Sequence, residues 1–211
     1  NIQYYEKRNL PQNLRIYAAS DHAVGIDKTR HDLTCLLVVG VDDHEDIYLI
    51  DCWWSRQPSD IVVKAMIELM KRHRPLIWWA EKGHITKAIG PFLRKRMYET
   101  STHCRIEEVT PVANKVQRSQ SIIGRMAMKK VFFPKVSPWS GKAVDEVLKF
   151  PNSRHDDFVD TLSWIGMGLG QLHSPTVKSR ENLFPKFKTL AWVRWQSDLE
   201  ARQRQSLSSG F

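Results

Sequence analysis

A short, wholly apolar segment at residues 76–80 limits the possible folds of this chain more than any other feature. Pro75 precedes the segment, and the polar triplet Glu81-Lys82-Gly83 follows it. An apolar run of this length, without alternating polar positions, is typical of a β-strand that is covered on both faces. The chain is therefore expected to contain a sheet with helices packed on both sides.

The other segments show strand-like and helix-like patterns in alternation. Strands or short extended segments are predicted at residues 14–20, 33–41, 47–54, 105–109 and 131–134. Helices are predicted at residues 58–73, 85–98, 115–130, 140–150 and 154–172. The second and third strands flank a polar tetrad and are expected to form an antiparallel hairpin. This order predicts an α/β fold with a mixed sheet and helices on both faces.

The length and composition predict one folded domain with an appended tail. The chain has 211 residues, 42% of them hydrophobic, which is enough to bury one sizeable core. We expect an N-terminal arm at residues 1–13, the folded domain at residues 14–172 and a basic C-terminal tail at residues 173–211. The chain begins at Asn1 without an initiator Met, so we expect it to be a fragment of a longer polypeptide.

The charge of the chain predicts a polyanionic partner. Lys and Arg total 32 against 23 for Asp and Glu, which gives a formal net charge of +9 at pH 7. Such a surface favours nucleic acid first and an anionic membrane second. However, no apolar run is long enough to span a bilayer, and no signal peptide is recognisable. We therefore expect a soluble, intracellular protein that binds nucleic acid and no membrane.

Acidic side chains occur at the end of two predicted strands and at the start of one predicted helix. Asp21 and Glu81 follow strands, and Asp156, Asp157 and Asp160 open the last helix. Carboxylates placed in this way can converge in space, and hard cations such as Mg²⁺ or Mn²⁺ prefer carboxylate oxygens. The widely spaced cysteines predict neither a structural zinc site nor a disulfide framework. Two Mg²⁺ or Mn²⁺ ions held by these acids would hydrolyse a phosphodiester.

Each of these acids also has a structural interpretation. An Asp after a strand is often a turn former, and carboxylates at a helix start favour the positive end of the helix dipole. Asp157 and Asp160, however, lie three residues apart on one helical face beside the apolar stripe. Their mutual repulsion would need a cation to offset it, so the metal-binding interpretation is strongest for this pair.

Basic residues recur along the predicted helix at residues 115–130. They could hold DNA phosphates or form an ordinary solvated face. The candidate DNA-binding residues are Lys115, Arg118, Arg125, Lys129 and Lys130. Three histidines neighbour the acids, but isolated histidines are more often structural than ligands. They are His22, His84 and His155.

Three groups of motifs resemble those of the nuclease domain of large terminases, the DNA-packaging proteins of tailed double-stranded DNA viruses. Residues 14–21 with the following Gly-containing loop and residues 32–34 are similar to the first motif, and residues 77–83 to the second. The third is the most specific and comprises residues 115–118, 124–126, 131–134 and 150–162. The resemblance spans residues 15–172.

This resemblance implies an RNase H-like fold and a metal-dependent endonuclease. Asp21, Glu81 and Asp157 correspond to the catalytic, metal-binding acids of the family, with Asp156 or Asp160 supporting the third motif. The implied cofactors are two Mg²⁺ or Mn²⁺ ions. The implied reaction is cleavage of concatemeric double-stranded DNA during genome packaging, with little sequence specificity, at the packaging motor in the host cytoplasm.

The chain departs from the family pattern in two respects. The loop after the first acid lacks the usual small, glycine-rich sequence, and Asp27 or Asp32 in or beside it would add a carboxylate near the metals. The GxxxxGK[ST] phosphate-binding loop of a packaging ATPase is absent from the sequence. We therefore expect a nuclease fragment that cannot translocate DNA alone. The resemblance implies an N-terminal packaging ATPase domain, the portal and the small terminase subunit as partners in the full protein.

Two other functions remain open from the sequence. Another RNase H-like nuclease, such as a junction resolvase or a transposase, would share the same arrangement of acids, because fold does not fix the substrate. A non-catalytic DNA-binding module would use the basic helices to hold phosphates while the acids serve a structural purpose.

Overall fold

The computed structural model describes residues 2–22, 33–83, 89–110, 115–152 and 156–172. The expected basic tail at residues 173–211 lies outside the described residues. So do Asp27, Asp32, His84 and His155, to which the sequence assigned possible roles.

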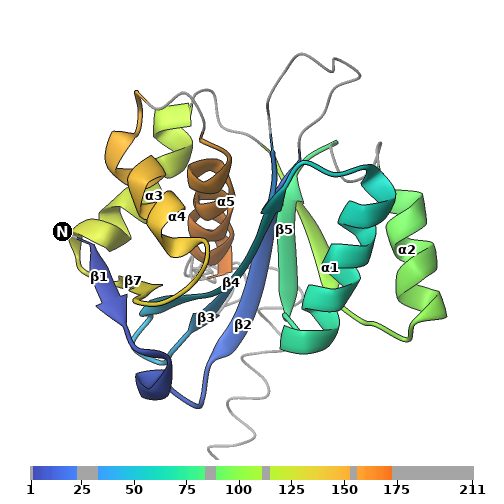
Figure 1. Cartoon of the computed structure of the whole chain (residues 1–211), viewed down its shortest axis with the longest axis horizontal. Helices are drawn as coiled ribbons and strands as arrows, with labels where there is room; N and C mark the ends of the chain where they lie inside the picture. The colour runs from blue at the N-terminus through green and yellow to red at the C-terminus, as the bar shows by residue number, and fades with distance from the viewer. Residues whose placement is uncertain (1, 23–32, 84–88, 111–114, 153–155, 173–211) are drawn as a thin grey trace, which may run out of the picture. The chain divides into compact units, whose positions relative to one another are not determined.

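The described part of the chain forms a seven-stranded mixed sheet in the order β1-β7-β4-β3-β2-β5-β6. The strands are β1 (Gln3–Tyr5), β2 (Arg15–Asp21), β3 (Thr34–Val41), β4 (Ile47–Ser55), β5 (Ile77–Glu81), β6 (Arg105–Val109) and β7 (Val131–Pro134). The helices are the short 3-10 helix η1 (Lys7–Asn9), α1 (Ser59–His73), α2 (Gly90–Glu99), α3 (Lys115–Ala127), α4 (Ser140–Lys149) and α5 (Asp157–Leu172). Helices α3, α4 and α5 cover one face, and α1 and α2 cover the other (Figure 1). The predicted α/β sheet with helices on both faces is confirmed.

Strand β5 is buried on both sides, as its uninterrupted apolar sequence predicts. Trp78 and Trp79 are both 0% exposed, although their side chains belong to opposite faces of the sheet. Trp79 packs in the core below α5, stacked on Tyr17 with ring centroids 5.2 Å apart. Trp78 packs in the core below α1 and α2, together with Met66 and Leu93. Each fully buried large apolar side chain contributes about 1.5–3 kcal/mol relative to exposure, so β5 anchors both layers.

Strands β2, β3 and β4 form an antiparallel meander at the centre of the sheet. Strands β3 and β4 make the predicted hairpin, and β2 pairs with β3 over its whole length, from Arg15↔Val41 to Asp21↔Cys35. On its other side β2 pairs in parallel with β5. The chain passes from β4 to β5 through α1, and this connection crosses over β3 and β2.

Residues 3–5, within the expected N-terminal arm, form the edge strand β1. This strand pairs in parallel with β7, and the Tyr5 hydroxyl donates a hydrogen bond of 2.8 Å to the Leu49 carbonyl oxygen. A segment of three residues is too short to show the alternation from which strands are predicted.

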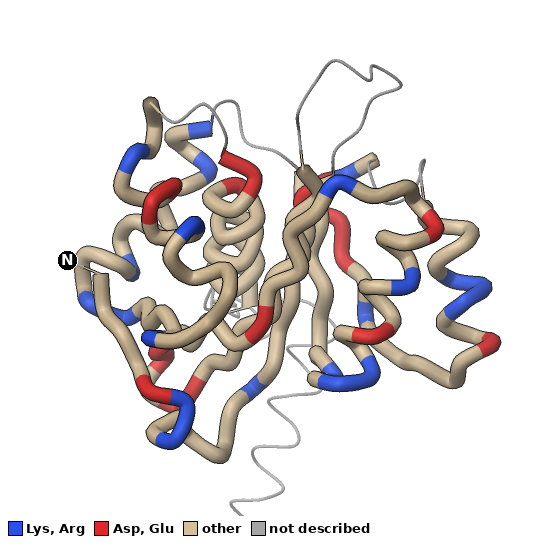
Figure 2. Tube along the Cα trace, in the orientation of Figure 1, with Lys and Arg blue, Asp and Glu red and all other residues tan. Residues whose placement is uncertain are grey.

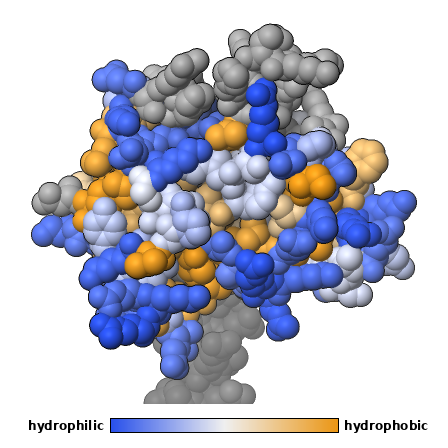
Figure 3. Space-filling view, viewed as in Figure 1, coloured by the Kyte–Doolittle hydropathy of each residue, from blue (hydrophilic) through white to orange (hydrophobic). Residues whose placement is uncertain are grey.

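The surface of the described residues is largely polar. In the view of Figure 3, hydrophilic side chains cover most of the face, and hydrophobic residues appear as scattered patches among them. Among the described residues, no helix combines the length and the apolar character that crossing a bilayer requires.

Figure 2 shows acidic residues gathered at the start of α5 and near the neighbouring ends of the sheet strands.

Candidate metal centre

Asp21 and Glu81 end two adjacent parallel strands at the same edge of the sheet. The register pairs Ser20 of β2 with Ala80 of β5, so each acid comes one residue later on its own strand. The Trp78 indole nitrogen donates a hydrogen bond of 3.0 Å to the Ser20 hydroxyl and links the two strands directly before the acids. Because in-register residues of neighbouring strands lie about 5 Å apart, the two carboxylates emerge side by side.

The first turn of α5 lies over this edge of the sheet. Asp21 pairs with Cys35 of β3, and the Thr161 hydroxyl lies 3.5 Å from the Cys35 carbonyl oxygen as a hydrogen-bond donor. Thr161 comes one turn after Asp157 and is adjacent to Asp160, which are 8% and 9% exposed. The helix therefore brings its opening carboxylates over the end of β2.

The pKa of Asp21 is raised by burial and by the neighbouring acids. Burial, and next the negative charges of Asp160, Asp157 and Glu81, raise it from 3.8 to about 8, while Arg118 lowers it. Like charges within a few ångströms disfavour ionisation in this way. The three segments that supply acids in the sequence thus act on one another electrostatically in the folded chain.

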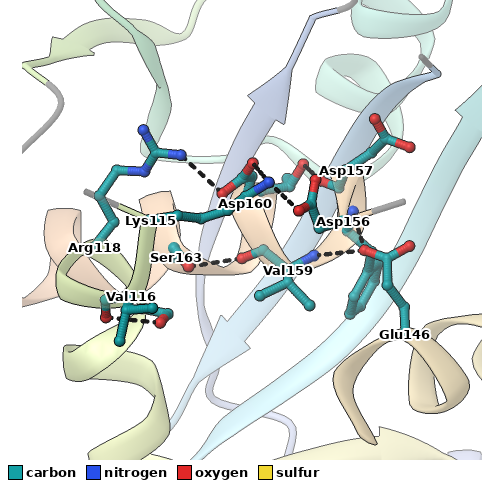
Figure 4. A network of polar contacts seen from close by, with 12 residues as sticks. Lys115, Val116, Arg118, Glu146, Asp156, Asp157, Val159, Asp160 and Ser163 are labelled. Atoms are coloured by element: carbon teal, nitrogen blue, oxygen red, sulfur yellow. Dashed lines mark hydrogen bonds and ion pairs between the residues drawn. The ribbon is translucent and has the colours of Figure 1, made fainter. Parts of the chain in front are cut away.

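Two cations of α3 are paired with the acids of α5 (Figure 4). Arg118 Nη2 donates a hydrogen bond of 3.0 Å to Asp160 Oδ1, and Lys115 Nζ lies 3.1 Å from Asp160 Oδ2. Lys115 also forms an ion pair with Asp156. The guanidinium carbon of Arg118 lies over the Trp164 ring, 5.1 Å from its centroid, which holds the side chain in place. Asp156 and Asp160 are therefore both paired with cations of α3.

Glu146 of α4 also lies at the start of α5, and no sequence signal pointed to it. Its Oε1 accepts hydrogen bonds from the backbone nitrogens of Phe158 and Val159, at 2.8 and 3.0 Å. Burial raises the pKa of Glu146 to about 7, and the charges of Asp157 and Asp156 also raise it, against the two hydrogen bonds. In the sequence, Glu146 is one of several polar residues in an amphipathic helix, so only the fold identifies it.

Solved structures of phage nuclease domains are similar to this fold. The large terminase nuclease from thermophilic phage G20c matches with a TM-score of 0.55 and 15% sequence identity, covering 77% of this chain and 90% of that chain. The same nuclease with bound magnesium matches with a TM-score of 0.54 and 14% identity, covering 79% and 91%. The large terminase nuclease domain of Thermus phage P74-26 matches with a TM-score of 0.53 and 12% identity, covering 77% and 88%.

The chain has the fold of a large terminase nuclease. This result confirms the RNase H-like fold that the motifs implied. At the level of sequence, no protein-family model matches the chain, and no curated protein is significantly similar to it. The similarity therefore lies in the arrangement of strands and helices.

Within the terminase nuclease fold, the predicted DNA-binding residues divide between the two ends of α3. Lys115 and Arg118 lie beside the acids, whereas Arg125 pairs with Glu45 and Lys130 with Asp46, each at 3.6 Å. The turn that supplies these two partners connects β3 to β4 at the end where β2 begins, and β2 spans about 20 Å. The exposed Lys129 is a neighbour of Lys130. The structure thus brings Lys115 and Arg118 to the acids and places the other three residues elsewhere.

The acids at the sheet edge and at the start of α5 supply the kind of ligand atom that a hard divalent cation prefers. All are carboxylates, and burial together with the negative charges of the neighbouring acids raises the pKa of Asp21 to about 8. Among the described residues, however, no group of three or more His, Cys, Asp or Glu side chains is arranged to hold a metal ion.

The remaining candidate ligands are His22 and the three cysteines, and their surroundings favour a structural role. His22, directly after Asp21, is buried. The three cysteines are free, and Cys35 is fully buried beside Cys52, with 3.8 Å between the sulfur atoms. These thiols fit the interpretation of small buried side chains better than that of metal ligands.

Proposed function

We propose that this chain is the nuclease domain of a large terminase, a metal-dependent endonuclease that cleaves concatemeric double-stranded DNA during viral genome packaging. The observation that carries the proposal is the meeting of Asp21, Glu81 and the first turn of α5 at one edge of the sheet, within a terminase nuclease fold. If the acids served only local structure, there would be no reason for three separate segments to bring them to the same place.

Asp21, Glu81 and Asp157 are the residues that would hold the metal. The related phage G20c nuclease has been solved with bound magnesium, zinc and cobalt, and the all-carboxylate donors here favour Mg²⁺ or Mn²⁺. When bound, two such ions supply an activated water and stabilise the departing oxygen of a phosphodiester. The acids of the chain would hold the two positive ions at the sheet edge. The buried strand β5 keeps Glu81 in place.

Asp156 and Asp160 have a supporting role in this proposal. Both are already paired with cations of α3, so they orient Lys115 and Arg118 instead of contributing their oxygens to the metal. Lys115 is 35% exposed at its side chain, compared with 17% for Arg118. Lys115 is therefore the residue that reaches a DNA phosphate beside the scissile bond, while Arg118 holds Asp160.

Contacts of this kind predict cleavage with little sequence preference. Lysine and arginine contacts to phosphates position a duplex but carry no information about its bases. The packaging ATPase domain, the portal and the small terminase subunit are the proposed partners in the full protein, at the packaging motor in the host cytoplasm. These assignments rest on the terminase motifs and the terminase nuclease fold together.

The test is a cleavage assay on linear double-stranded DNA with and without Mn²⁺ or Mg²⁺. Wild-type protein is expected to cut only with metal, and Asp21→Ala and Asp157→Ala are expected to lose cutting while keeping DNA affinity. The matched control is Asp145→Ala, which removes an exposed carboxylate of α4 and should cut normally. A wild-type chain that binds DNA without metal-dependent cutting would instead be a binding module.

The other RNase H-like nucleases remain the second candidate, because they share the acid arrangement. Competition between linear duplex and a four-way junction separates the two functions. Equal or better cleavage of the linear duplex supports the terminase assignment, and strong preference for the junction supports a resolvase.

A further inference from the structure

The start of α5 is built in an unusual way. Asp156 occupies the N-cap position, since its carbonyl oxygen accepts the first helical hydrogen bond from the Asp160 nitrogen at 2.8 Å. An Asp at this position normally turns its side chain back onto the backbone N–H groups of the first turn. Here the Asp156 carboxylate is instead paired with Lys115.

Glu146 supplies the cap that Asp156 does not. The two N–H groups that an N-cap side chain ordinarily accepts are those of Phe158 and Val159, and both donate to the same Glu146 oxygen. Glu146 is 6% exposed and comes from α4, twelve and thirteen residues earlier in the chain. The cap is therefore a tertiary contact instead of a local one.

We infer that Glu146 is a positioning residue for the metal-binding acids, an inference that rests on the proposed nuclease function. By taking over the cap, Glu146 leaves the carboxylates of Asp156 and Asp157 available for Lys115 and for metal. It also fixes the backbone directly after Asp157, because the next two backbone nitrogens are held against α4. In Figure 4 the Asp157 side chain projects away from Glu146.

Burial of a carboxylate next to other carboxylates is unfavourable and has to be offset. Two hydrogen bonds from backbone N–H groups and the positive end of the α5 dipole offset part of this cost. The chain accepts the burial of Glu146 where a local Asp or Ser cap would have sufficed for the helix alone. The arrangement makes sense if the local acid is needed for another contact.

The experiment compares three substitutions at one position. Glu146→Gln keeps an oxygen acceptor at the same reach but removes the charge, whereas Glu146→Asp keeps the charge but is one methylene too short. Glu146→Ala removes both, and Asp145→Ala on the same helix is the control. Each variant is measured for folding by circular dichroism, for Mn²⁺ binding by calorimetry, and for kcat and KM on linear duplex DNA.

A positioning role predicts that Glu146→Gln keeps most of the wild-type rate and Mn²⁺ affinity. Glu146→Asp and Glu146→Ala should lose about 10- to 100-fold in Mn²⁺ affinity or kcat, the usual effect of removing a residue that orients metal ligands, with KM for DNA little changed. If Glu146→Ala does not fold, the comparison of Glu146→Gln with Glu146→Asp still tests the positioning role.

Two results would overturn the inference. Full activity and Mn²⁺ affinity in both Glu146→Asp and Glu146→Ala would show that the cap is dispensable. Loss in Glu146→Gln with retention in Glu146→Asp would show that the negative charge itself is required, as for a direct metal ligand. The proposed nuclease function fails separately, if the wild-type chain neither binds Mn²⁺ nor cuts DNA, or if Asp157→Ala still cuts.

Discussion

Arg118 and Asp160 lie 42 residues apart in the sequence and are joined by a hydrogen bond of 3.0 Å in the folded chain. The bond ties α3 to α5 at the turn that carries the candidate metal-binding acids. It also places a fixed positive charge next to Asp21, whose pKa Arg118 lowers against the effect of the surrounding carboxylates. Arg118 therefore balances part of the negative charge at this site, and the proposed metal would balance more of it.

The pairing of Asp160 predicts that the two buried acids of α5 respond differently to substitution. Asp157→Asn should abolish both Mn²⁺ binding and cleavage. Asp160→Asn should keep Mn²⁺ binding and lose about 10- to 100-fold in rate, because it disturbs the orientation of Arg118 and Lys115. Calorimetric titration with Mn²⁺ and single-turnover cleavage check this, and equal loss of Mn²⁺ binding in both variants would make Asp160 a ligand.

Substitution of Lys115 should have opposite effects on Mn²⁺ binding and on DNA binding. Removing its charge leaves Asp156 and Asp160 less compensated, so Lys115→Ala should bind Mn²⁺ more tightly. The same variant should bind DNA more weakly and reduce the slope of log affinity against log salt by about 1, as expected for one lost phosphate contact. Lys71→Ala, an exposed lysine of α1 on the opposite face of the sheet, is the control. Weaker binding of both Mn²⁺ and DNA would contradict this arrangement.

The sequence predicted the sheet well because the relevant signals are local. The uninterrupted apolar run of β5, the polar tetrad between β3 and β4, and the acids at strand ends each depend on a few consecutive residues. The position of a residue at a strand end also indicates where it lies in the fold, since the ends of neighbouring parallel strands meet at one edge of a sheet. The sequence could therefore predict that Asp21 and Glu81 can converge, whereas the pairing of β2 with β5 is known from the fold.

The polar network around α5 could not be predicted in the same way. Its contacts join Lys115 to Asp156 and Glu146 to Phe158, across 41 and 12 residues of chain. No periodic pattern encodes which of several charged residues on two amphipathic helices will meet. The basic helix α3 illustrates this, because one end faces the acids while Arg125 pairs with Glu45 in a distant turn.

The close packing of α5 on β5 predicts a large effect of adding one methyl group. A Cβ at Gly168 would overlap the indole ring of Trp79, which is fully buried two residues before Glu81. Gly168→Ala should destabilise the chain by about 1–3 kcal/mol, the usual result of overpacking a core. Gly170→Ala, two residues later in the same helix, meets nothing within 4 Å and should be neutral or slightly stabilising. Urea denaturation of both variants measures the difference, and similar midpoints would show that α5 can shift away from β5.

The raised pKa of Asp21 predicts how metal-free stability depends on pH. Because the folded value is about 8 and the ordinary value is 3.8, the folded chain binds more protons at this residue than the unfolded chain between these limits. The contribution of Asp21 to stability is therefore full below about pH 4 and is lost as pH rises through 8. In EDTA, the melting temperature should fall between pH 5 and pH 8.5, and Asp21→Asn should flatten this fall. Mn²⁺ requires the ionised carboxylate, so its stabilising effect should grow over the same range. A stabilisation by Mn²⁺ that is constant with pH, or unchanged by Asp21→Asn, would place the metal away from Asp21.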